Sequence, residues 1–181
     1  MANKNQKGCV IVTGASRGIG AAISLELARA GYTVGCLSRS GDMPQIEDAT
    51  DADRAQWFSV KCDVSRPEQL KAAFADVQQR SKQPIVGLVN NAGGQYRTAM
   101  STISTKGFEA VVRNNLTGGF IFMREAYNRW MKDHGGAIVN IIADIWHGWP
   151  DLAHSGAARG GMHTLSETAA CEWAADGVRV N

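Results

Sequence analysis

The sequence predicts an α/β domain in which a doubly wound parallel sheet carries helices on both faces. Two observations lead to this prediction. Short apolar runs alternate with helical patterns along the 181 residues, and a glycine-rich turn joins the first apolar run to the first helical pattern. Strands that alternate with helices imply right-handed crossovers and parallel pairing. Because no repeat, low-complexity tract or linker interrupts the pattern, we expect a single domain over residues 1–181.

Six apolar runs are expected to form the strands of this sheet. Each is short and is bounded by polar residues or glycines, as is typical of buried strands. The runs cover residues 9–12, 32–37, 56–61, 85–89, 137–142 and 177–181. The polar stretch 41–54 is expected to be a loop with at most one short helix.

The helices are expected between these runs. The first follows the glycine-rich turn. Ser65 and Glu68 have the spacing of a capping box and predict that a second helix starts there. Apolar residues at steps of three and four predict one long helix over residues 106–132 and a final long helix over residues 155–175.

The composition is ordinary for a soluble globular protein. Hydrophobic residues make up 44% and charged residues 20%, and the net charge is +2. This balance gives no reason to expect nucleic acid or an anionic membrane as a partner. The N-terminus lacks the apolar core of a signal peptide, and no apolar stretch approaches the length of a membrane span. The cysteines form no CxxC pair, so we expect small buried residues in a reducing compartment, the cytoplasm.

The glycine-rich turn, residues 13–20, lies between a strand and a helix, which is the context that a phosphate-binding fingerprint requires. Its small residues let the backbone approach a pyrophosphate, and the start of the following helix presents free N–H groups. The glycine spacing is GxxxGxG instead of the more common GxGxxG. The residues expected to contact a dinucleotide here are Gly14, Ser16, Arg17, Gly18, Ile19 and Gly20.

The end of the second predicted strand indicates which dinucleotide is bound. An NAD site would place an acid there to hold the ribose 2′-OH. Here the chain has Ser38-Arg39-Ser40 instead, with Arg17 in the glycine-rich turn. Two guanidinium groups suit a 2′-phosphate, because arginine makes planar bidentate bonds to phosphate oxygens. NADP(H) is therefore favoured, and the alternative is that Arg39 is only a solvated loop residue.

Further polar residues follow the third and fourth predicted strands, at the edge where open α/β sheets bind ligands. Asp63 is suited to accept a hydrogen bond from an adenine amine, with Val64 packing on the ring. The alternative is an aspartate that only stabilises a turn. Asn115, on the apolar face of the long helix, is either a satisfied core asparagine or part of a proton-relay or oxyanion network. The fourth strand runs into further candidate cofactor residues, which are Asn91, Ala92 and Gly93.

Taken together, these motifs resemble the short-chain dehydrogenase/reductase family. The motifs are Thr13 to Gly20, Asp63-Val64, Asn90 to Gly93 and Asn114-Asn115-x-x-Gly118. The resemblance covers all 181 residues and implies a Rossmann-type, NADP-binding domain. Within the family, the runs 88–95, 130–142 and 154–159 are similar to the trans-2-enoyl-CoA reductases of the peroxisomal type, with the 2,4-dienoyl-CoA reductases next.

The resemblance places the usual catalytic tyrosine at Ser155 and the usual lysine at Arg159, which argues against a carbonyl reductase of ordinary mechanism. Reduction of an activated double bond needs a hydrogen-bond donor at the thioester oxygen and an acid, but no tyrosinate. Asn115 and Ser155 are candidates for the donors, and Arg159 is a candidate for anchoring the nicotinamide ribose. The proton source stays open among Ser155 with water, Tyr96, Asp144, His154 and His163.

The expected function is therefore NADPH-dependent reduction of a 2-enoyl thioester. The alternatives are a dehydrogenase of another small carbonyl or alcohol, and a catalytically inactive NADP-binding or oligomerisation protein. The histidines have no metal-ligand spacing, so no metal is predicted. The resemblance implies a homodimer or homotetramer, in which the two long helices pair. It also implies further segments after Asn181, so the last part of the fold is expected to be missing: the chain is a fragment or does without the usual lid.

Overall fold

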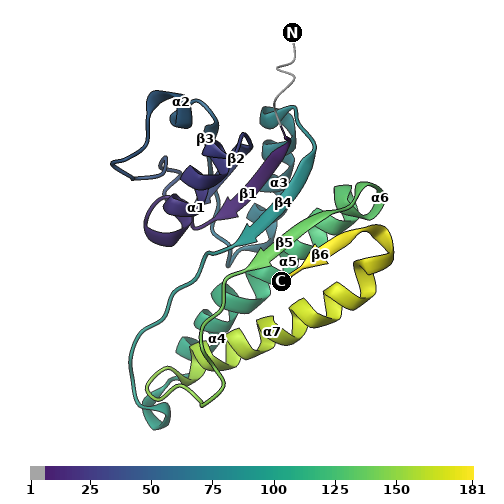
Figure 1. Cartoon of the computed structure of the whole chain (residues 1–181). Coiled ribbons are helices and arrows are strands. Elements are labelled where there is room, and N and C mark those ends of the chain that lie inside the picture. The colour runs from purple at the N-terminus through teal and green to yellow at the C-terminus, as the bar shows by residue number, and fades with distance from the viewer. Residues whose placement is uncertain (1–6) are drawn as a thin grey trace.

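A six-stranded parallel sheet forms the centre of the computed structural model, which describes residues 7–181 (Figure 1). The strand order is β3-β2-β1-β4-β5-β6. The strands are β1 (Cys9–Thr13), β2 (Thr33–Ser38), β3 (Trp57–Lys61), β4 (Ile85–Asn90), β5 (Gly136–Asn140) and β6 (Val178–Val180). The order reverses between β1 and β4, which creates the topological switch point where such sheets bind ligands. The predicted fold class is confirmed.

Helices lie on both faces of the sheet. They are α1 (Gly18–Arg29), α2 (Asp51–Arg54), α3 (Pro67–Ser81), α4 (Thr105–Val112), α5 (Gly118–Ala126), α6 (Lys132–His134) and α7 (Ala153–Trp173). Short 3₁₀ turns lie at Met100–Thr102 and Ala174–Asp176. Side chains of α3, α5 and α7 share one hydrophobic core with the sheet, and side chains of α1 belong to a second core. Val139 of β5 is 41% exposed, so the face that carries α1 is only partly covered.

The alternation of side chains along β1 shows how the two cores are divided. Cys9 and Ile11 belong to the core under α3, α5 and α7, whereas Val10 and Val12 belong to the core under α1. Successive side chains of a strand point to opposite faces. A strand buried on both faces therefore reads as an unbroken apolar run, which is the pattern that predicted it.

The predicted long helix is confirmed, with an irregularity that the sequence pattern does not show. Helical backbone continues from Thr105 to His134, but π-helical turns replace α-helical ones at Arg113–Thr117 and Tyr127–Met131. Each widened turn changes the direction in which the following side chains point, and such turns are frequent at functional sites. The first of them contains Asn115, the polar residue on the apolar face.

The predicted capping box is wrong. Helix α3 begins at Pro67, and its N-cap residue, Arg66, makes no side-chain cap bond. Proline at the first helical position already supplies the required φ and has no N–H to satisfy. The Ser65 hydroxyl instead donates to Asp63 Oδ1 over 2.7 Å. A capping box does exist in the stretch 41–54, where Thr50 and Asp53 cap the short helix α2.

The expectation that all cysteines are buried is wrong for Cys171, which is exposed on α7. The other three are buried in the sheet or at its edge. Burial raises the pKa of the Cys9 thiol to about 11 and of the Cys36 and Cys62 thiols to about 12. These three thiols therefore stay protonated at neutral pH, which is typical of unreactive cysteines in a hydrophobic core.

Among residues 7–181, no helix is both long and apolar enough to cross a membrane, and no cluster of metal-ligating side chains is found.

Candidate functional site

A groove of about 750 Å³ runs along the carboxyl ends of β1, β2 and β4, at the topological switch point. Most of the predicted cofactor residues line it. These are Gly14, Ser16, Arg17, Gly18, Ile19, Gly20, Arg39, Val64, Asn91, Ala92 and Gly93. Two predicted cofactor residues, Asp63 and Arg159, are not part of this lining. Further lining residues that the sequence analysis did not assign are Ser38, Ser40, Asp42, Gln45, Cys62, Gly94 and Asn114.

The glycine-rich turn is packed directly against the end of β4. Asn91 Nδ2 donates to the carbonyl oxygens of Thr13 and Gly14 over 2.9 and 3.2 Å. Within the described residues, no side chain caps the start of α1, so the first backbone N–H groups of that helix remain available to an anion. The turn and the helix start together form the kind of site that binds a phosphate group.

The charge at the β2 end of the groove is positive. Arg17 and Arg39 are both exposed and both line the groove, together with a single acid, Asp42. The chain turns back directly after Arg39, because the N–H of Gly41 donates to Ser38 Oγ over 3.0 Å. The two guanidinium groups can therefore reach an anion bound beside β2.

Asp63 has the contacts of a turn residue. Its Oδ1 accepts hydrogen bonds from the backbone N–H of Ser65 (2.9 Å) and from the Ser65 hydroxyl (2.7 Å). Partial burial raises the pKa of Asp63, but these bonds and the nearby charges of Arg39 and Arg66 outweigh it and lower the pKa overall. Because Oδ1 already accepts two hydrogen bonds, Asp63 Oδ2 is the more available acceptor for an adenine amine.

Asn115 holds the segment that follows β4. The side chain is 2% exposed. Its Oδ1 accepts from the N–H of Gly94 (2.8 Å), and its Nδ2 donates to the carbonyl oxygen of Gly94 (3.0 Å) and to Ser155 Oγ (3.4 Å). The π-helical turn thus places an amide where it pairs with the backbone of residue 94, so this asparagine is satisfied.

Ser155 lies in the first turns of α7 and is fully buried. Its hydroxyl donates to Gln95 Oε1 over 2.7 Å and accepts from Asn115 Nδ2. One turn later, Arg159 Nη1 donates to the carbonyl oxygen of Ile141 over 2.6 Å. Burial lowers the pKa of Arg159, although an arginine side chain remains protonated at neutral pH. The structure therefore brings Asn115 and Ser155 into contact, with Arg159 on the same helix as Ser155.

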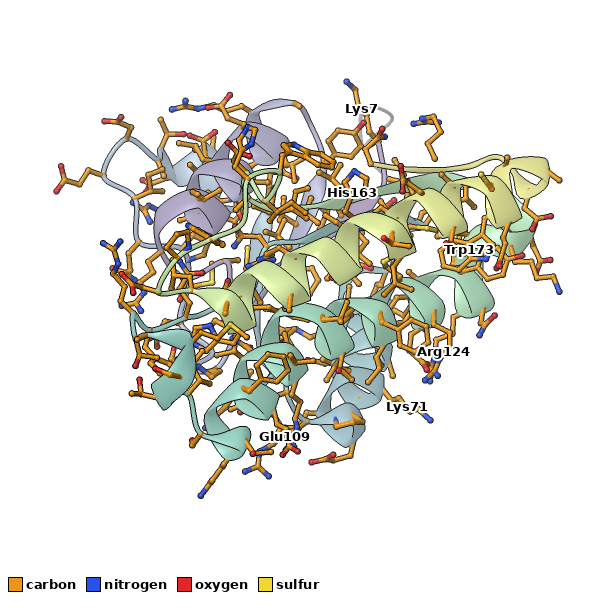
Figure 2. All side chains as sticks on the ribbon, turned by 90° about the horizontal axis from the view of Figure 1, so that it is seen from below. Lys7, Lys71, Glu109, Arg124, His163 and Trp173 are labelled. Atoms are coloured by element: carbon orange, nitrogen blue, oxygen red, sulfur yellow. The ribbon has the colours of Figure 1, made fainter. Side chains whose placement is uncertain are left out.

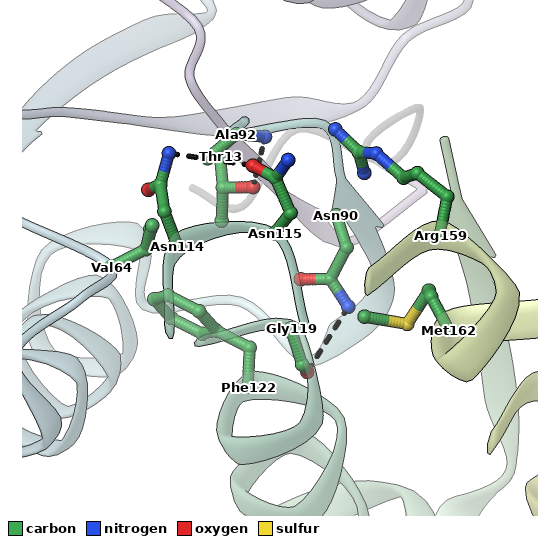
Figure 3. A pocket seen from close by; sticks show the side chains of 10 residues that line it. All are labelled: Thr13, Val64, Asn90, Ala92, Asn114, Asn115, Gly119, Phe122, Arg159 and Met162. Atoms are coloured by element: carbon green, nitrogen blue, oxygen red, sulfur yellow. Dashed lines mark hydrogen bonds between the residues drawn. The ribbon is translucent and has the colours of Figure 1, made fainter. Parts of the chain in front are cut away.

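A small cavity of about 10 Å³ lies beside these residues, and side chains of β4, the long helix and α7 reach it (Figure 3). Asn90 Oδ1 is buried there, and none of residues 7–181 offers it a hydrogen-bond donor. The volume is that of a single water molecule. A water bound there would satisfy Asn90 Oδ1.

The other candidate acids have their contacts elsewhere. Asp144 is exposed and its Oδ1 accepts from the backbone N–H of Trp146. His163 lies 3.3 Å from Glu167 and packs edge-on with Trp146. His154 is buried, accepts at Nδ1 from the N–H of Ser155, and packs edge-on with Tyr96 at 4.6 Å.

Comparison with known proteins identifies the family. The family described as short chain dehydrogenase matches residues 8–181. The chain belongs to the short-chain dehydrogenase family. Members of this family bind a nicotinamide cofactor, NAD or NADP, and act on small molecules. The groove of this short-chain dehydrogenase fits such a cofactor, because the uncapped N-terminus of α1 and the side chains of Arg17 and Arg39 line it.

Individual relatives are longer than this chain. A peroxisomal 2,4-dienoyl-CoA reductase of Danio rerio is 31% identical over 94% of this chain and 57% of its own length. A 3-oxoacyl-[acyl-carrier-protein] reductase of Staphylococcus epidermidis is 30% identical over 94% of this chain and 71% of its own length. Among solved structures, a citronellol catabolism dehydrogenase of Pseudomonas aeruginosa is 38% identical with a TM-score of 0.81, covering 96% of this chain and 72% of that one.

Proposed function

We propose that this short-chain dehydrogenase binds NADP(H), with the 2′-phosphate held by Arg17 and Arg39. The observation that carries the proposal is the pair of exposed guanidinium groups at the β2 end of the groove. The position at which an NAD site needs an acid is Ser38, whose hydroxyl is already bonded to the backbone of Gly41. Asp42 alone opposes the positive charge there.

The experiment is a titration with NADPH and with NADH, followed by nucleotide fluorescence. Arg39→Ala is expected to weaken NADPH binding roughly 10- to 100-fold, because hydrogen bonds to a charged group contribute about 1.5–3 kcal/mol. Binding of NADH, which lacks the phosphate, is expected to change less than about 2-fold. The matched control is Arg113→Ala, an exposed arginine of the long helix outside the groove lining. Equal wild-type affinity for both nucleotides would refute NADP selectivity.

For the reaction, we propose reduction of a 2-enoyl thioester. Two of the relatives, a dienoyl-CoA reductase and an oxoacyl-carrier-protein reductase, are named for acyl thioester substrates, which supports an acyl thioester as the substrate here. When bound, the reduced cofactor supplies a hydride to the β-carbon. Negative charge then develops on the thioester oxygen, and Ser155 and Asn115 donate hydrogen bonds to it. Arg159 adds positive charge and holds the nicotinamide ribose.

The α-carbon must then receive a proton. We propose that it arrives through the Ser155 hydroxyl, which solvent reprotonates. Asp144 accepts from the backbone of Trp146, and His163 is paired with Glu167. His154 Nδ1 accepts from the N–H of Ser155, and His154 Nε2 is buried without a hydrogen-bond partner among residues 7–181. Within those residues, none of the three donates a hydrogen bond to Ser155 Oγ. Water exclusion is incomplete in this arrangement, because Gln95 and its neighbours are exposed.

A second candidate is an NADP-binding protein without catalysis. The observation that favours it is that Asn115, Ser155 and Arg159 are each bonded to groups of the chain itself. A third is a dehydrogenase of another small carbonyl or alcohol. NADPH binding without oxidation by crotonyl-coenzyme A or by any small carbonyl compound would favour the binding protein.

We further propose that the protein forms a homodimer or homotetramer through α7 and the long helix, which run side by side (Figure 2). Phe108 and Phe120 of the long helix are each 39% exposed, and an aromatic side chain of that exposure gains from burial at an interface. Multi-angle light scattering is expected to give a multiple of the 19.4 kDa chain mass at micromolar concentration. A monomer at that concentration would contradict the proposal, and Phe120→Lys is expected to shift the equilibrium toward monomer.

A further inference from the structure

Consecutive residues of one segment contact the three side chains that the proposed reaction uses, Asn115, Ser155 and Arg159. We call residues 93–95 the strap. The amide of Asn115 pairs with both backbone groups of Gly94, and Ser155 Oγ donates to Gln95 Oε1. Gly93 lies so close to Arg159 that a Cβ at this position would overlap the guanidinium group. The strap therefore covers the place where a substrate would have to meet Ser155.

The bond between Ser155 and Gln95 joins a fully buried hydroxyl to an exposed side chain. At 2.7 Å it has the usual length of an O–H···O hydrogen bond. The acceptor is an amide carbonyl oxygen, which is sp²-hybridised like the carbonyl oxygen of a thioester. Gln95 thus presents to Ser155 the same type of acceptor that the proposed substrate would present.

We propose that Gln95 Oε1 occupies the binding position of the substrate carbonyl oxygen, and that a carbonyl ligand must displace it. A serine hydroxyl has one proton and donates to one acceptor at a time. Ser155 serves either Gln95 or the ligand. This inference rests on the proposed function, because it takes Ser155 as a donor to the substrate carbonyl. Gln95 is thereby a positioning residue whose amide oxygen competes with the substrate carbonyl oxygen for the Ser155 proton.

The Asn115 amide completes the subsite. Its Nδ2 carries two protons, of which one is donated to the carbonyl oxygen of Gly94 and the other points to Ser155 Oγ over the longer distance of 3.4 Å. When a ligand replaces Gln95, this second proton becomes a further donor for the ligand oxygen. The oxygen-binding position is thus defined by Ser155 and Asn115, and Gln95 fills it in the ligand-free protein.

The test is equilibrium binding of crotonyl-coenzyme A to the protein saturated with NADP⁺, in which no hydride is available and the complex cannot react. A competing neutral hydrogen bond lowers ligand affinity roughly 2- to 10-fold. Gln95→Ala is therefore expected to lower the Kd by that factor and, with NADPH, to lower KM while kcat stays within about 2-fold. Gln95→Glu is expected to raise Kd, because a carboxylate accepts from Ser155 more strongly than an amide does.

The control variant is Gln79→Ala, an exposed glutamine of α3, which is expected to leave Kd and KM unchanged. A purely structural role for Gln95 would give weaker binding in Gln95→Ala, and that result overturns the proposal, as does an unchanged Kd. If the wild type reduces crotonyl-coenzyme A and Gln95→Ala does not bind it more tightly, this inference fails while the proposed function stands. If neither protein binds the thioester, the proposed function fails and this inference with it.

Discussion

Gly20→Ala is expected to abolish NADPH binding and to destabilise the domain. A Cβ at position 20 would overlap the carbonyl oxygen of Gly14 and lie 2.6 Å from Asn91 Nδ2 and 2.9 Å from the carbonyl carbon of Gly14. Because backbone atoms are in the way, the turn itself must move, which costs about 1–3 kcal/mol of unfolding free energy. The turn then no longer presents its N–H groups to a pyrophosphate. Loss of two charge-assisted hydrogen bonds corresponds to a decrease in affinity on the order of 100-fold or more.

The same chemical change at Gly160 is the matched control. Gly160 lies inside α7, where the nearest atom to an added Cβ is Ile145 Cδ1 at 3.7 Å. Gly160→Ala is expected to raise the unfolding free energy by about 0.5–1 kcal/mol and to leave NADPH affinity unchanged. Urea unfolding and the fluorescence titration measure both quantities. If Gly20→Ala bound NADPH like the wild type, the close approach of turn and strand would have no role in the cofactor site.

The sheet and its helices could be predicted because their signals are local. All residues of β1 are apolar or buried because both faces of this strand are covered, and this unbroken apolar run is visible in the sequence. The glycine-rich turn could likewise be predicted, because the sequence shows an apolar strand pattern before it and a helical pattern after it. Asn91 follows the apolar run of β4 directly, and its amide bonds to Thr13 and Gly14 hold it at the carboxyl edge of the sheet.

Other features of the fold and the site could not be predicted from the sequence. They depend on contacts between residues that are distant in the sequence, or on local hydrogen bonds that compete with the expected ones. Ser65 had the spacing of an N-cap, but Asp63 lies two residues away and accepts from its hydroxyl instead. Gln45 lines the groove because its backbone N–H donates to the carbonyl oxygen of Ser16, a bond that no pattern in the loop indicates. The apolar residues around Asn115 recur at steps of three and four, which is the pattern of an α-helix, so periodicity does not reveal the π-helical turn there.

The candidate catalytic residues could likewise be predicted individually, but their contacts with one another could not. Family motifs picked out Asn115, Ser155 and Arg159 without saying which of them touch. The contact between Gln95 and Ser155 joins residues that are 60 positions apart in the sequence. Gln95 belongs to no motif that would have marked it as a functional residue. Only the folded chain shows that the hydroxyl proposed for the substrate already has an acceptor.

Ser155→Ala is expected to lower kcat for crotonyl-coenzyme A about 10²- to 10³-fold, the effect of removing one donor from an oxyanion site. The fold should tolerate the change. Asn115 Nδ2 keeps its bond to the carbonyl oxygen of Gly94, and Gln95 is exposed and can turn to water. NADPH affinity should stay within about 2-fold, because Ser155 does not line the groove. Steady-state kinetics, the nucleotide titration and the melting temperature separate these effects.

Thr168→Ala provides the control on the same helix. Its hydroxyl is exposed and donates to the carbonyl oxygen of Thr164, so its loss should change neither kcat nor nucleotide affinity. Wild-type turnover in Ser155→Ala would leave Asn115 as the sole donor to the thioester oxygen and would remove the proton route through Ser155. A wild-type protein that binds NADPH and turns over no thioester would instead favour the binding protein, because then the bonds of Asn115, Ser155 and Arg159 to the chain itself are their whole function.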